Sequence, residues 1–194
     1  MARTRSTEVH QRILEAALRL FSERGFESTS MDSIARDAGV TKPTLYNHWT
    51  DKEALMMEVM LYVNGIRGER EEFDSGSLVD DLAWVLTRRP PDEFEELRMR
   101  MMPGLVAYSA THPAFGAAWR NNILTPARQA LTKALERGMK RGEISRGFDM
   151  DVALCLLLGP MLYRHIFHGK ADLEIEIVGR EVAQAFARAY INED

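Results

Sequence analysis

Residues 26–60 of the chain read FESTSMDSIARDAGVTKPTLYNHWTDKEALMMEVM. The first part of this stretch has apolar residues at helical spacing: Met31, Ile34, Ala35 and Ala38. Gly39 follows directly, and glycine adopts the positive φ of a tight turn without steric cost. The pattern therefore predicts a short helix that ends in a turn at Gly39.

A second short helix is predicted directly after this turn, from Lys42 to about His48. Thr41 stands at the cap position, and Pro43 lies in the first turn, where a missing N–H is harmless. We expect Leu45 to point into a core, so that the polar side chains face outward. Two short helices at this spacing are typical of a helix-turn-helix, whose second helix enters the major groove of DNA. The alternative is two ordinary short helices joined by a turn.

Helices are also predicted on both sides of this pair. Residues 7–24 form an amphipathic helix that stops before Gly25. The segments at residues 29–32 and 50–53 each fit a capping box. We therefore expect Thr29 to cap the helix that follows it, and Thr50 to open a helix that reaches roughly residue 67.

The rest of the chain shows a helical period, and no stretch alternates as a strand would. We expect further helices at about residues 76–89, 92–111, 114–141, 149–168 and 172–191. Proline should kink the second of these at Pro103, and kink or split the third and fourth at Pro126 and Pro160. The sequence predicts an all-α protein of about nine helices. A three-helix DNA-binding domain with a helix-turn-helix is expected over residues 1–66, and a C-terminal helical bundle over residues 67–194.

Composition excludes several classes of protein. The chain has 194 residues, 45% of them hydrophobic and 28% charged, as in an ordinary globular protein. Its single cysteine, Cys155, rules out an internal disulfide and a cysteine-based zinc site. The N-terminus lacks an apolar signal segment, and the longest apolar run, residues 152–163, is too short to span a bilayer. We expect a soluble, cytoplasmic protein with no membrane partner. Its net charge of −4 gives only a weak hint about nucleic acid.

The quoted segment resembles the DNA-binding domain of the TetR family of bacterial transcriptional regulators. The resemblance covers about residues 6–66 and includes the LRLFSERGF ending of the preceding helix, the AGV turn, TLYNHW and DKEAL. Pro43, Trp49 and Thr50 depart from the commonest pattern, and they bear on which operator is bound. The resemblance implies DNA contacts from the starts of the second and fourth helices and from the recognition helix. The residues concerned are Thr29, Ser30, Thr41, Lys42, Pro43, Thr44, Tyr46, Asn47, His48 and Lys52.

The resemblance also implies a homodimer formed through the last two helices. Residues 152–162, VALCLLLGPML, are apolar all round, so this helix must be covered on every side. Burial within a monomer would satisfy that need equally well.

Members of the family commonly bind a small effector in the C-terminal bundle. Candidate wall residues are Trp84, Phe94, Met99, Met102, Leu105, Tyr108, Phe115, Trp119, Ile123, Met161 and Tyr163. Methionine and aromatic residues at this spacing are also usual in an ordinary core.

No metal, cofactor or catalytic site is expected. His165 and His168 share a helix face, but only His112 could add a third imidazole. The sequence contains no GxSxG, HExxH, GxGxxG or P-loop motif, so an enzyme is not expected. We expect a homodimeric, ligand-responsive repressor that binds a palindromic operator. The alternative is a DNA-binding protein without a small-molecule effector, controlled by a protein partner.

Overall fold

The computed structural model describes residues 2–66, 73–88, 92–167 and 174–191. Within these ranges every regular secondary-structure element is a helix, with ten α-helices, one 3₁₀ segment and one π segment. The predicted all-α class is confirmed. None of the described helices is both long and apolar enough to cross a membrane. The chain forms two compact units, Met1–Arg67 with Pro90–Ile123, and Gly68–Arg89 with Leu124–Asp194.

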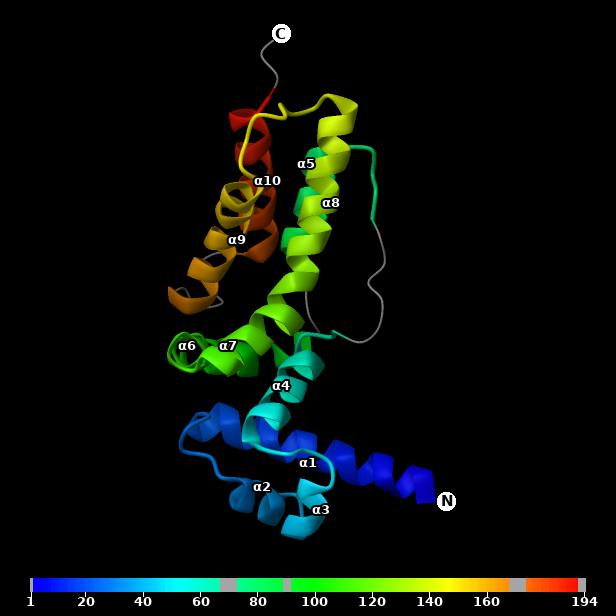
Figure 1. Cartoon of the computed structure of the whole chain (residues 1–194), viewed down its shortest axis with the longest axis vertical. Coiled ribbons are helices and arrows are strands. Elements are labelled where there is room, and N and C mark those ends of the chain that lie inside the picture. The colour runs from blue at the N-terminus through cyan, green and yellow to red at the C-terminus, as the bar shows by residue number, and fades with distance from the viewer. Residues whose placement is uncertain (1, 67–72, 89–91, 168–173, 192–194) are drawn as a thin grey trace. The chain divides into compact units, whose positions relative to one another are not determined.

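The first unit contains the predicted helix-turn-helix. Its described helices are α1 (Ala2–Arg24), α2 (Met31–Asp37), α3 (Lys42–Tyr46), α4 (Lys52–Val63), α6 (Glu95–Thr111) and α7 (Pro113–Trp119). A 3₁₀ turn, Asp92–Phe94, leads into α6. Figure 1 shows α2 and α3 together on one side of α1.

One apolar core joins these helices. α1 contributes Ile13, Ala17 and Phe21, which lie four residues apart and are fully buried. Leu105 of α6 and Phe115 of α7 belong to the same core, although both fall in the expected second domain. Packing therefore groups α6 and α7 with α1–α4. The division at residue 66 stays a prediction.

Two of the predicted helix caps were wrong by one residue. Ser30, not Thr29, caps α2, and its hydroxyl accepts from the backbone N–H of Ser33. Asp51, not Thr50, caps α4 and accepts from the backbone N–H of Ala54 at 2.7 Å. The carboxylate of Asp51 also interacts favourably with the positive end of the dipole of α4. α4 is shorter than expected and ends at Val63.

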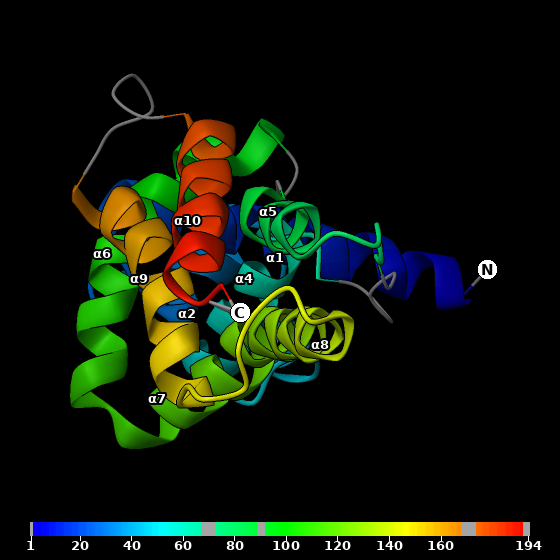
Figure 2. The same cartoon turned by 90° about the horizontal axis from the view of Figure 1, so that it is seen from above.

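The second unit is a helical bundle. Its described helices are α5 (Leu78–Thr87), α8 (Thr125–Arg141), α9 (Met150–Phe167) and α10 (Ile175–Ala189). Figure 2 shows α10 between α5 and α9. Gly179 permits the close approach of α10 to α5, because a Cβ there would lie 2.5 Å from Cγ2 of Thr87.

A buried carboxylate joins α5 to α8. Asp81 is almost fully buried and accepts hydrogen bonds from the backbone N–H and the hydroxyl of Ser75, at 2.7 and 2.8 Å. Arg137 and Arg141 of α8 lie 3.2 and 3.4 Å from its other oxygen. Burial acts to raise the pKa of Asp81, but the Ser75 bonds and the Arg137 guanidinium together hold it below the ordinary value of 3.8.

The helix predicted over residues 114–141 is split, which accounts for ten helices instead of about nine. A π segment, Arg120–Leu124, separates α7 from α8, and Pro126 lies in the first turn of α8. Proline cannot donate the N–H that a continuous helix needs, so the break lies where the sequence allowed it. Pro160, in contrast, lies inside an unbroken α9, and Pro103 inside an unbroken α6.

Candidate nucleic-acid interface

The turn between α2 and α3 is fixed by backbone hydrogen bonds. Gly39 has a φ of +65°. Its N–H donates to the carbonyl of Arg36 at 3.2 Å, and the N–H of Val40 donates to that of Ala35 at 2.9 Å. These two bonds form a Schellman motif, in which glycine takes the left-handed position. Val40 packs against the first core, so the turn sets the direction in which α3 begins.

Helix α3 is anchored by one side chain and exposes the others. The Thr41 hydroxyl caps it by accepting from the N–H of Thr44 at 3.4 Å. Pro43 lies in its first turn, and Leu45 is fully buried. Tyr46 is 50% exposed. A five-residue helix this short cannot be stable alone, so Leu45 and the capped turn hold it in place.

The structure brings most of the predicted DNA-contacting residues together on α2, α3 and the residues beside them. Ser30, Thr41, Lys42, Pro43, Tyr46 and Asn47 are exposed, and Thr44 and His48 are half-buried. Lys42 forms an ion pair with Asp32 of α2 at 2.6 Å. Both side chains are at least half-exposed. An exposed ion pair of this kind is weak enough to exchange for a phosphate.

Thr29 and Lys52 lie differently from that exposed set. The Thr29 hydroxyl is buried and donates to the carbonyls of Leu20 and Gly25. Nζ of Lys52 donates to three carbonyls of residues 26, 27 and 29, at 2.8, 3.2 and 2.9 Å. It also lies 4.4 Å from the centroid of the Phe26 ring. Burial lowers the pKa of Lys52, against the opposing effect of two nearby glutamates. The donors of both side chains are thus used inside the fold.

Sequence reasoning missed a cluster that adjoins the end of α3. Glu58 of α4 accepts from Nε1 of Trp49 and bonds to Nε2 of His10, each at 2.6 Å. The rings of His10 and Trp49 stack with their centroids 4.5 Å apart. Nδ1 of His48 lies 3.4 Å from Nδ1 of His10. We call these four residues the His10 cluster. His10 and Glu58 are 48 positions apart in sequence, and no local motif joins them.

The predicted effector residues divide between the two units. Leu105, Phe115 and Trp119 are buried in the first core, and Phe94, Met102, Tyr108 and Ile123 pack against it. Met161 is buried in the second core, Trp84 stacks on Phe73, and Tyr163 is 57% exposed. Met99 is half-buried. Within each unit the buried members therefore belong to the apolar core, and their contact with an effector stays a prediction.

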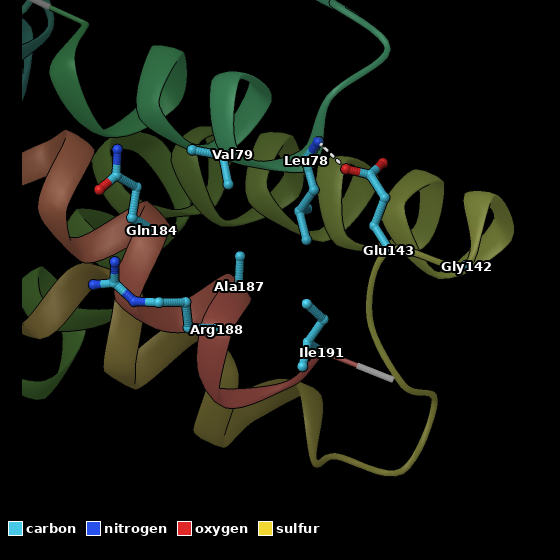
Figure 3. A pocket seen from close by; sticks show the side chains of 8 residues that line it. All are labelled: Leu78, Val79, Gly142, Glu143, Gln184, Ala187, Arg188 and Ile191. Carbon is cyan, nitrogen blue, oxygen red and sulfur yellow. Dashed lines mark hydrogen bonds between the residues drawn. The ribbon is translucent and has the colours of Figure 1, made fainter. Parts of the chain in front are cut away.

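A cavity of about 500 Å³ lies in the second unit, between the start of α5 and the ends of α8 and α10 (Figure 3). It is lined by Leu78, Val79, Gly142, Glu143, Gln184, Ala187, Arg188 and Ile191. Figure 3 shows Arg188 and Gln184 side by side on α10, with aliphatic side chains across from them. None of the eleven predicted effector residues lines this cavity. Glu143 accepts from the backbone N–H of Leu78, so its carboxylate is tied to the start of α5.

Helix α9 carries an exposed apolar face, in contrast to the exposed polar face of α3. Its exposed large apolar residues are Val152, Leu156, Leu162, Tyr163 and Phe167. Leu156 is 50% exposed and Phe167 is 69% exposed. Steps of four and seven residues place Val152, Leu156 and Tyr163 along one side of the helix. Ile177 of α10 is exposed as well. The apolar side chains of this helix, which the sequence predicted to be covered on every side, are thus partly exposed within one chain.

The histidine pair considered for a metal falls outside what can be described, since His168 and the side chain of His165 are not placed. In the part of the chain that the structure describes, no three or more His, Cys, Asp or Glu side chains are arranged to hold a metal ion.

Known proteins match the chain along most of its length. The family model described as bacterial regulatory proteins, tetR family, matches residues 13–59, and that of the tetracyclin repressor-like C-terminal domain matches residues 73–190. The uncharacterized HTH-type transcriptional regulator YdeS of Bacillus subtilis (strain 168) is 30% identical over 174 residues, covering 86% of this chain and 83% of YdeS. UidR of Escherichia coli (strain K12), another HTH-type transcriptional regulator, is 27% identical over 184 residues, covering 94% and 90%.

Solved structures show the same fold. GusR of Salmonella enterica superposes with a TM-score of 0.68 at 23% identity, covering 93% of this chain and 95% of GusR. A TetR-family regulator from a Rhodococcus species superposes with a TM-score of 0.69 at 20% identity, covering 95% and 100%.

The chain belongs to the TetR family of bacterial transcriptional regulators. It is a DNA-binding regulator rather than an enzyme, as the sequence predicted. The helix-turn-helix of α2 and α3 lies within the matched N-terminal segment.

Proposed function

We propose that the protein is a homodimeric repressor that binds a palindromic operator through α3 and is released by a small apolar or amphipathic effector. The observation that carries this proposal is the geometry of α3. Leu45 anchors the helix in the core, while Lys42, Tyr46 and Asn47 face solvent on one short element. Donors, acceptors and an aromatic ring on one rigid face are what base edges and phosphates require.

The exposed apolar face of α9 supports the homodimer. A second copy of the chain would cover Leu156 and Phe167 by a two-fold arrangement in which each protomer presents the same surface. A two-fold dimer presents two copies of α3, which suits half-sites about 34–36 Å apart along the duplex. Dimer symmetry and operator symmetry would then match.

The cavity in the second unit supports a small-molecule effector. Its volume of about 500 Å³ falls in the usual range of ligand sites, which is roughly 300–1,000 Å³. Leu78, Ala187 and Ile191 offer an apolar wall, and Arg188 offers a cation at the edge. An amphipathic effector with an acidic or polar end fits this lining. We expect the effector to weaken operator binding without dissociating the dimer.

The test is selection of bound duplexes from fragmented genomic DNA at two salt concentrations. Binding that depends only on phosphates falls steeply as salt rises, whereas binding to an operator persists. We expect recovery of a palindrome at the higher salt concentration. Recovery of nothing above background, or of a sequence without two-fold symmetry, would contradict the dimeric repressor. The functions of the genes beside a recovered palindrome then indicate which compounds to test as effectors, by their effect on operator affinity.

A further inference from the structure

The first unit has a cavity of its own, a groove of about 340 Å³ between α1 and α4. This volume lies at the lower end of the range that is usual for small-molecule sites. Leu14 of α1 and Ala54, Met57 and Leu61 of α4 give it an apolar wall. We call this space the α1–α4 groove. It shares no lining residue with the cavity in the second unit, and none of the residues predicted to contact DNA or an effector lines it.

Glu58 gives the groove a negative charge. Its Oε1 lies 2.6 Å from Nε2 of His10, and its Oε2 accepts from Nε1 of Trp49 at the same distance. Each oxygen of a carboxylate has two lone pairs, so both can accept from a further donor. The side chain is 39% exposed, so a ligand can reach it. A donor that carries a positive charge forms the stronger bond with such a group.

Gln11 adds an acceptor to the same groove. Its Nε2 donates to the carboxylate of Glu15 at 2.9 Å and to the Tyr62 hydroxyl at 3.2 Å. Both N–H bonds of this amide are thereby used, so Gln11 can meet a ligand with its carbonyl oxygen. Among the described residues that line the groove, none is a lysine or an arginine. The lining therefore favours a ligand with a cationic donor at one end and an apolar body.

We propose that the α1–α4 groove binds a small organic amine with an apolar body, and that Glu58 links this site to the end of the recognition helix. The amine donates to the Glu58 carboxylate, and its apolar part covers Met57 and Leu61. Asn47 is the C-cap of α3, and Trp49, two residues later, is held by the same carboxylate. A ligand on Glu58 therefore acts on the bond that fastens this end of α3 to α4.

The site is tested on the full chain by the indole N–H signals of ¹⁵N-labelled tryptophan. The chain has three tryptophans, and Trp84→Phe and Trp119→Phe assign the signal of Trp49 by elimination. The probes are octylamine, octanol and octanoate, which share one apolar chain length and differ in charge. Octylamine is a cation at pH 7.5, as a lysine side chain is.

Octylamine is expected to shift the Trp49 signal until the site is saturated. Its affinity should be at least about tenfold higher than that of octanol, as one hydrogen bond to a charged group would give. Octanoate should bind more weakly than octanol. Absence of a saturable shift with octylamine would overturn the proposal. Octanol or octanoate binding as tightly as octylamine would do the same, because Glu58 would then not select a cation.

Glu58→Gln tests the negative charge, since it keeps an acceptor for Trp49. It should weaken octylamine binding about tenfold and leave octanol binding unchanged. Glu23→Gln is the matched control, because Glu23 is exposed on α1 and does not line the groove. It should bind octylamine as the wild type does. Unchanged octylamine affinity in Glu58→Gln would overturn the role of this carboxylate.

Ala54→Leu tests the location by filling the groove. Ala54 is half-buried, so the larger side chain should be tolerated, and circular dichroism checks the fold. The response of Trp49 to octylamine should disappear. Ala187→Leu fills the cavity in the second unit in the same way and should leave that response intact. If Ala187→Leu removes the response and a folded Ala54→Leu does not, the amine occupies the other cavity and the α1–α4 groove is not the site.

These measurements separate the inference from the proposed function, because they need neither DNA nor a known operator. Loss of the octylamine site would leave the repressor proposal intact. Failure of the genomic selection would remove the repressor proposal, and the signal of Trp49 would still decide whether the groove binds the amine.

Discussion

The two units of the molecule differ in their exposed chemistry. The first exposes polar side chains on α3, around an apolar anchor at Leu45. The second exposes apolar side chains on α9, and a buried carboxylate, Asp81, lies in its interior. The exposed faces of α3 and α9 therefore suit different partners. A polar face on a short anchored helix suits nucleic acid, and an apolar face on a long helix suits another protein surface.

The largest effect is expected from a charge on the α9 face. Leu156→Glu should weaken dimerisation about a thousandfold or more, because burial of a leucine is worth roughly 1.5–3 kcal/mol in each protomer and a buried unpaired charge adds to the loss. Since Leu156 is half-exposed within one chain, the monomer should remain folded. Analytical ultracentrifugation measures the association, and operator affinity should fall with it.

Gln129→Glu is the control for that substitution, since it adds the same charge to an exposed position on α8. It should leave the dimer unchanged. If both variants remain dimeric at the concentration where the wild type does, α9 is not the interface and the comparison between the two exposed faces fails.

The next effect concerns the interior of the second unit. Asp81→Asn should lower the free energy of unfolding at pH 7 by about 3 kcal/mol, because it leaves two arginines beside a buried neutral group. The pKa of Asp81 lies below 3.8 in the folded protein, so its contribution is complete above that pH and is lost as the pH falls further. The difference between wild type and variant should therefore shrink below about pH 4 in denaturant titrations.

Asp80→Asn provides the neighbouring control. Asp80 is half-exposed and lies 3.5 Å from Arg180, so its loss should cost at most about 1 kcal/mol. Equal costs for the two variants at pH 7 would show that the buried network contributes no more than a surface pair.

Much of the first unit could be predicted because its signals are local. Gly39, Thr41 and Leu45 lie within seven positions, and each acts on the backbone or core directly beside it. The caps were misplaced because Thr29 and Ser30 are both good cap residues. The choice is made by packing, which buries Thr29 against carbonyls of residues 20 and 25.

The other parts of the site depend on contacts between distant segments. Lys52 was expected to contact phosphate because it begins a helix, yet its partners belong to a loop more than twenty positions earlier. The apolar run of α9 indicated burial, but composition does not say whether the cover comes from the same chain. The effector residues were chosen by type, and type does not distinguish a cavity wall from a packed core.

Two exposed residues of α3 give a sharper test of the first unit. Lys42→Ala and Tyr46→Ala should each lower operator affinity by about 1–3 kcal/mol without changing the melting temperature. The lysine variant should also reduce the salt dependence by about one phosphate contact. Fluorescence anisotropy over a range of salt concentrations measures both quantities.

Lys52→Met should behave in the opposite way. It keeps an apolar stem beside Phe26 but removes the donor to three carbonyls, so we expect a loss of about 1–3 kcal/mol in stability. The salt dependence of its binding should equal that of the wild type. If Lys52→Met lowers the salt dependence and Lys42→Ala does not, the two lysines have been assigned the wrong roles.

The smallest effect is expected at the contact between α6 and α4. Tyr108 donates its hydroxyl proton to Glu53 at 2.6 Å, and this bond, together with burial, raises the pKa of Tyr108 to about 12. Tyr108→Phe should cost about 0.5–1.5 kcal/mol at pH 8. Because the folded state binds this proton more tightly, the contribution is complete below about pH 10 and is lost as the pH rises toward 12. Urea titrations at pH 8 and pH 11 should therefore show a smaller difference at the higher pH. If the difference in stability between the wild type and Tyr108→Phe grows with pH, the assigned hydrogen bond is wrong. The first unit is thus expected to lose one contact in alkali, whereas the second loses its buried ion pairs in acid.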